Sequence, residues 1–123
     1  MRDHTKLRAF ELADQLAIAV YRLTRSFPAD EQFGLTSQIR RAAVSVASNI
    51  VEGCARSTQA EYVRFLDIAY GSAREVEYQL SLASRSGYAP EELLPAVADL
   101  AVADLAAETG RVLSGLIRSL RKN

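Results

Sequence analysis

The apolar residues of this chain recur every three or four positions in four separate stretches, and this spacing restricts the chain to helices. An amphipathic α-helix places positions three and four apart on one face, so each stretch can bury one side in a core. No useful length of sequence alternates apolar and polar residues as a half-buried strand would. At 123 residues, the pattern predicts a single all-α domain, an antiparallel up-and-down four-helix bundle over residues 1–123.

The expected helices cover about residues 7–27, 35–55, 58–86 and 90–121. Pro28 should end the first helix at Phe27, because the residue before a proline is pushed out of the α region. Pro90 suits a first helical position, whereas Pro95 is expected to bend or separate the first turn of the fourth helix.

Local signals also mark the ends of the two middle helices. Thr36 or Ser37 is expected to cap the second helix. Thr58, followed three residues later by Glu61, is typical of a capping box that opens the third helix. Gly87 is well placed as the left-handed residue that stops the third helix.

Charge and cysteine usage exclude several classes of protein. Fifteen basic and fifteen acidic side chains cancel, which argues against a globally basic nucleic-acid binder but allows a local basic patch. The single cysteine, Cys54, excludes an intramolecular disulfide and a paired-cysteine metal site, and it fits the reducing cytoplasm. We expect neither a signal peptide nor a membrane span, because no apolar run approaches about 20 residues.

The sequence offers little for catalysis, so we expect no catalytic residue, no cofactor and no metal. His4 lies in a terminus that we expect to fray, and Cys54 is expected to be a buried, inert thiol. The alternative is a small metal-binding or enzymatic bundle that uses carboxylates of the second and third helices. Those carboxylates are Glu52, Glu61, Asp67, Glu75 and Glu77.

The second helix is apolar over more than half of its circumference and should be the most buried. A narrow polar stripe remains on it, formed by Arg41, Ser45, Asn49 and Glu52 at spacings of four, four and three. Buried polar groups need hydrogen-bond partners. The stripe is therefore either a buried network, in which Arg41 or Arg40 pairs with a carboxylate of the third helix, or a docking groove for a ligand or nucleic-acid phosphate.

Basic residues supply the candidates for binding RNA or a protein partner, since arginine suits both phosphate and carboxylate. The candidates are Arg40, Arg41, Arg56, Arg64, Arg118, Arg121 and Lys122. The last three also complement the dipole at a helix C-terminus, and that alone would explain them.

A second face of the fourth helix indicates self-association. Small residues at heptad-like spacing permit close approach of another helix, from this chain or from a neighbouring subunit. They are Ala96, Leu100, Ala103, Ala107, Gly110 and Ser114. Alanine is also a good helix former, so this row is alternatively a solvent face. Ile18, in the polar face of the first helix, is either a lone exposed residue or a contact with a partner subunit.

The stretch Leu35–Gly53, LTSQIRRAAVSVASNIVEG, resembles the signature of a bacterial family of four-helix bundle proteins, also called the 23S rRNA intervening-sequence proteins. The resemblance extends to FPADEQFG before this stretch and to AEYVRFLDIAYGSAREVEYQL after it. It covers roughly two thirds of the chain. Ala47 stands where the family commonly has proline, so a proline kink in this helix is not expected.

The resemblance implies a bundle that assembles as a homopentameric ring and has no known enzymatic activity. Some members of the family are encoded inside intervening sequences of ribosomal RNA genes, which suggests an association with RNA. A protein similar in fold, the accessory variability determinant of diversity-generating retroelements, binds nucleic acid and a reverse transcriptase through a basic surface. We therefore expect a non-enzymatic homo-oligomeric scaffold or adaptor, associated with RNA or a protein partner.

Overall fold

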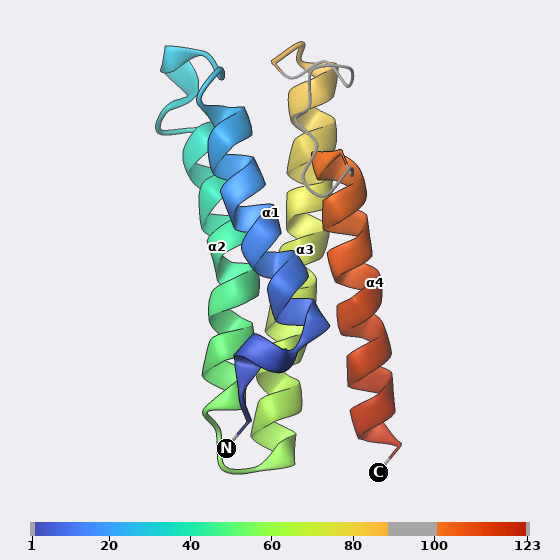
Figure 1. The fold of residues 1–123 in the computed structure, drawn as a ribbon. Coiled ribbons are helices and arrows are strands. Elements are labelled where there is room, and N and C mark those ends of the chain that lie inside the picture. The colour runs from blue at the N-terminus through green and yellow to red at the C-terminus, as the bar shows by residue number, and fades with distance from the viewer. Residues whose placement is uncertain (1, 89–100, 123) are drawn as a thin grey trace.

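In a computed structural model that describes residues 2–88 and 101–122, four α-helices run alternately up and down around a common core (Figure 1). This arrangement confirms the predicted all-α four-helix bundle. The helices are α1 (Arg8–Thr24), α2 (Leu35–Cys54), α3 (Gln59–Arg85) and α4 (Val102–Arg121), with short 3-10 turns η1 (His4–Lys6) and η2 (Ala29–Glu31). The expected first part of the fourth helix, with Pro90, Pro95, Ala96 and Leu100, lies outside the described residues.

Both predicted ends of α3 are present. The Thr58 side chain accepts a hydrogen bond from the backbone N–H of Glu61 at 3.2 Å, and so caps the first turn. Gly87 adopts a φ of 78°, and the backbone N–H of Tyr88 donates to the Ala83 carbonyl oxygen at 2.9 Å. This is the left-handed helix stop that glycine favours, because a side chain at such a φ is strained.

The N-terminus of α2 corrects the expectation that Thr36 or Ser37 caps it. The capping position is Gly34, and Thr36 is a buried residue inside the first turn. The backbone N–H of Leu35 instead donates to the Glu31 carboxylate, with 2.9 Å between nitrogen and Oε1. The η2 turn folds Glu31 back over the start of the helix, so the cap comes from four residues upstream.

The first helix ends at Thr24, earlier than the Phe27 that the sequence predicted. The chain turns before Pro28 and directs the Phe27 side chain into the core. There the centroids of the Phe27 and Tyr88 rings lie 5.8 Å apart. Burying this ring is favourable, and it offsets the backbone hydrogen bonds that a further turn of α1 would have formed.

The core runs along the inside of the bundle in two packed clusters of buried side chains. Leu16, Ile39, Leu66 and Leu105 are completely buried within it. The second helix is continuous through Ala47, as the absence of proline predicted. No helix in residues 2–88 and 101–122 is long and apolar enough to cross a membrane.

Candidate interaction surfaces

The basic candidates fall into two sets near opposite ends of the bundle. Arg40 and Arg41 lie in the first half of α2, toward the end of the bundle where α1 stops. The other set gathers where α2 and α4 end and α3 begins (Figure 1). We call it the lower basic set; it consists of Arg56, Arg64, Arg118, Arg121 and Lys122.

Part of the lower basic set is neutralised by neighbouring carboxylates. Arg56 lies 3.7 Å from Glu52, and Arg121 pairs with Asp67 across α3 and α4. Both pairs are exposed, so each contributes little to stability, but each offsets positive charge at this end of the bundle. The lower basic set is therefore a weaker anion-binding surface than its sequence suggests.

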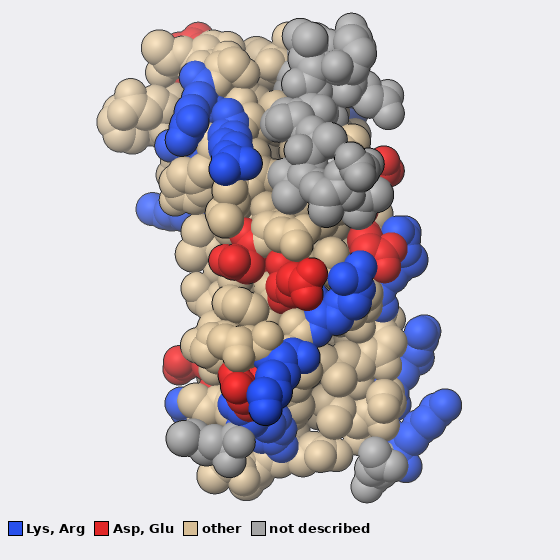
Figure 2. Space-filling model, viewed as in Figure 1, with Lys and Arg blue, Asp and Glu red and all other residues tan. Residues whose placement is uncertain are grey.

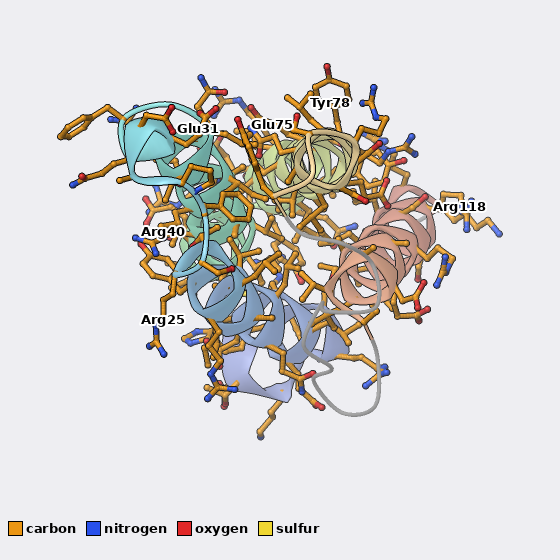
Figure 3. The ribbon with its side chains drawn as sticks, turned by 90° about the horizontal axis from the view of Figure 1, so that it is seen from above. Arg25, Glu31, Arg40, Glu75, Tyr78 and Arg118 are labelled. Carbon is orange, nitrogen blue, oxygen red and sulfur yellow. The ribbon has the colours of Figure 1, made fainter. Side chains whose placement is uncertain are left out.

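Arg40 is held in place by two contacts with α1. Its Nε donates a hydrogen bond to Thr24 Oγ1 at 2.7 Å, and its guanidinium carbon lies 4.7 Å from the centroid of the Tyr21 ring. Neither Arg40 nor Arg41 forms an ion pair with a described carboxylate, so the first of the two alternatives, a pairing with the third helix, is wrong. The helix turns Arg40 toward α1, and Figure 3 shows it pointing outward from the side where α1 and α2 meet.

A groove of about 540 Å³ opens beside Arg40. We call it the α1–α2 groove; its lining residues are Tyr21, Gln32, Phe33, Thr36, Ser37, Arg40, Arg41, Val44 and Ser45. Phe33 is 91% exposed and Tyr21 is 44% exposed. Sequence reasoning overlooked Phe33, although a bulky aromatic residue in a polar connector between two helices is a signal that was available.

The polar stripe on α2 forms a network only in its middle. The Ser45 hydroxyl lies 2.9 Å from that of Ser72 on α3, and Asn49 Nδ2 donates to the Ser45 carbonyl oxygen at 2.8 Å and to its hydroxyl oxygen at 2.9 Å. Arg41 and Glu52, at the two ends, are exposed. The expectation of a buried network is wrong for these two residues, since both side chains lie at the surface.

The small residues of α4 that the structure describes line a surface groove beside α3. Two hollows, of about 370 and 410 Å³, share Glu77 and Ala107 and form what we call the α3–α4 groove. Ala103, Ala107, Gly110 and Ser114 lie along it, together with Arg118 at one end. Since these side chains are short, α4 leaves this space open.

The described residues present no reactive constellation. Burial raises the pKa of the Cys54 thiol, and burial also raises the pKa of Tyr62 to about 12. His4 is not frayed as expected: it belongs to the η1 turn, and its ring stands edge-on to Phe10 at 4.6 Å. No group of three or more His, Cys, Asp or Glu in residues 2–88 and 101–122 is placed to hold a metal ion.

Comparison with known proteins identifies a family to which this chain is similar and a solved structure with the same fold. A family model described as 23S rRNA-intervening sequence protein matches residues 5–103. A crystal structure of a protein of unknown function from Bacteroides thetaiotaomicron, assigned to the S23 ribosomal protein family, aligns with a TM-score of 0.77. The two chains are 23% identical over 89% of this chain and 95% of that one, which shows the fold alone. Comparison with curated proteins gives no match.

Proposed function

Because this chain belongs to the 23S rRNA-intervening sequence protein family, we propose that it is a non-enzymatic helical scaffold that assembles with copies of itself and associates with RNA. The observation that carries this proposal is the α3–α4 groove. A groove floored by alanine and glycine at helical spacing suits the close approach of another helix. The described helices of this chain leave it open, and we assign the partner helix to a second copy.

The assembly that we propose is a homopentameric ring, as the family resemblance implies. In a ring, each subunit presents two different surfaces, one of which receives the other surface of its neighbour. The α3–α4 groove is the receiving surface, and Ile18 on α1, 46% exposed, is the inserted residue that we assign to the neighbour. Because Ile18 is already about half buried, removing the rest of it from water in such a contact gains about 1 kcal/mol.

Several observations support a scaffold over the alternative of a small metal-binding or enzymatic bundle. The carboxylates Glu52 and Asp67 are paired with arginines, and Glu77 lies 3.2 Å from Arg74 Nε. The unpaired thiol of Cys54 suits a reducing cytoplasm, which is where we place the protein.

The test is the mass of the purified protein in solution, by light scattering on a sizing column, with absorbance recorded for protein and for nucleic acid. We expect a pentamer that carries nucleic acid. Ala103→Glu, in the α3–α4 groove, should lower the mass to that of the monomer, because a charged side chain would be buried without a partner.

The matched control is Ala60→Glu, since Ala60 is also exposed on a helix but lies outside the groove. This variant should keep the mass of the wild type. A monomeric wild-type protein, or an Ala103→Glu variant that assembles normally, would contradict the proposed assembly.

A further inference from the structure

Four arginines that form no ion pair with any other described residue border the α1–α2 groove and the hollow beside it. Arg22 and Arg25 line a neighbouring hollow that shares Tyr21 with this groove, and Arg40 and Arg41 line the groove itself. None of the four forms an ion pair with any residue in the part of the chain that the structure describes. In Figure 2, two basic side chains lie together near the end of the bundle where α1 stops. This edge therefore attracts anions although the net charge of the chain is zero.

Asp30 and Glu31, the two acidic residues between these arginines in the sequence, do not neutralise their charge. Glu31 is bonded to the backbone N–H of Leu35, and it accepts a hydrogen bond from the Tyr88 hydroxyl at 2.9 Å. Figure 3 shows Glu31 on the side of α2 that faces α3, away from Arg25 and Arg40. Asp30 is exposed in the η2 turn and is not among the residues that line the groove.

The same groove carries aromatic rings that water surrounds. The Phe33 side chain is 91% exposed, which is a costly position for a large ring in a free protein. The Tyr21 ring is partly exposed and has the Arg40 guanidinium over it. Aromatic faces next to arginines are the combination with which proteins hold unpaired bases and the phosphates that join them.

Arg40 is prepared to receive a phosphate group. Its Nε is bonded to Thr24 Oγ1, and Thr24 in turn donates to the Val20 carbonyl oxygen at 2.8 Å, so the guanidinium is fixed before any ligand arrives. Fixing a side chain in advance lowers the entropy that binding costs. Thr36 and Ser37, at the positive end of the α2 dipole, line the same groove.

We propose that the α1–α2 groove binds single-stranded RNA, with a base stacked on Phe33 and the adjoining phosphate held by Arg40 and Arg41. Only a single strand offers an unstacked base to an exposed ring, so a duplex is a poorer ligand. The inference rests on the proposed association with RNA and names the surface that performs it. The residues that contact the RNA include neither the α3–α4 groove nor Ile18, the two surfaces assigned to assembly.

The test measures the binding of a fluorescently labelled single-stranded oligouridylate to the full chain and to two variants, by fluorescence anisotropy. Phe33→Ala removes the stacking ring and should weaken binding about tenfold, which is within the range for one base stack. Arg41→Gln should lower the slope of log affinity against log salt by about 0.7, as expected for one lost phosphate contact to a single strand. Both side chains are exposed, so neither change should alter folding or the mass of the assembly.

The matched controls separate this surface from the lower basic set and from simple loss of an apolar residue. Phe33→Trp should bind at least as tightly as the wild type, because it keeps a stacking face. Arg64→Gln removes the same charge from an exposed position outside the groove and should leave affinity unchanged within about twofold.

Each outcome bears on a different statement. If RNA binds but is insensitive to Phe33→Ala and Arg41→Gln, this inference is overturned while the RNA-associated scaffold stands. If the oligonucleotide does not bind at all, both the inference and the proposed association with RNA fail. A third outcome is that oligoglutamate displaces the RNA as effectively from the Phe33→Ala variant as from the wild type. This would indicate that the groove binds an acidic protein segment, and it would also overturn the inference.

Discussion

Gly53, in the last turn of α2, is the position where the closest approach of two helices can be tested most sharply. A Cβ atom placed there would lie 2.9 Å from Phe65 Cβ and 3.3 Å from the Tyr62 carbonyl oxygen. Neither atom belongs to the free end of a flexible side chain, so α2 and α3 would have to move apart. Replacing a helical glycine by alanine ordinarily gains up to about 1 kcal/mol. Overpacking a tight contact costs about 1–3 kcal/mol, so Gly53→Ala should destabilise the protein by about 1 kcal/mol net.

The control is Gly71→Ala, since Gly71 is exposed in the middle of α3 and a Cβ atom there meets nothing within 4 Å. This variant should gain about 1 kcal/mol, so the two variants should differ by about 2 kcal/mol in the free energy of unfolding. Urea unfolding at matched protomer concentration measures this difference, because assembly makes stability depend on concentration. A Gly53→Ala protein as stable as Gly71→Ala would refute the reasoning that α2 and α3 touch at Gly53.

Four further predictions concern single polar groups. Hydrogen bonds from the backbone N–H of Leu35 and, second, from the Tyr88 hydroxyl hold the pKa of Glu31 below its ordinary 4.5. The ionised Glu31 therefore stabilises the folded protein fully above pH 4.5, and this contribution is lost as the pH falls through the lowered pKa. Urea unfolding across the acid range should therefore show a weaker pH dependence for Glu31→Gln, and equal slopes would contradict this. Thr24→Val leaves Arg40 Nε without its acceptor and should cost about 1–2 kcal/mol by the same assay, whereas unchanged stability would show that the bond is replaced by water. The buried Cys54 thiol, whose pKa burial raises, should react with a thiol reagent only after unfolding, and the Tyr62 phenol should titrate near 12 by ultraviolet absorbance.

Predictions that rest on residues close together in the chain agree best with the structure. The Thr58 cap and the Gly87 stop involve backbone groups within five positions, so their geometry follows from local sequence. The cap of α2 failed as a prediction because it depends on the η2 turn, which returns Glu31 to the helix. The helix propensities and capping preferences of the residues in α2 contain no information about that turn, which lies before the helix.

The candidate surfaces show where sequence reasoning stops. The sequence singled out Arg40 and Arg41 but left open whether one of them pairs with a carboxylate of the third helix or both border a docking groove, and it did not predict that Arg40 lies against α1. It set the C-terminal basic residues apart from those of the second and third helices, whereas the structure places Arg56 and Arg64 at the same end of the bundle as the C-terminal ones and Arg40 and Arg41 near the other end. Phe33 became a candidate binding residue only because the structure shows its ring exposed beside Arg40 and Arg41.

The sequence by itself determined that four helices form and which side of each faces the core, because apolar periodicity and helix capping act within a few residues. Only the tertiary structure decided which helix each polar side chain meets, which parts of the α2 stripe are covered, and that the small residues of α4 border an open groove. The physical reason is that these properties depend on the rotation and spacing of packed helices. Many contacts between residues distant in the chain set those quantities together, and no short stretch of sequence contains them.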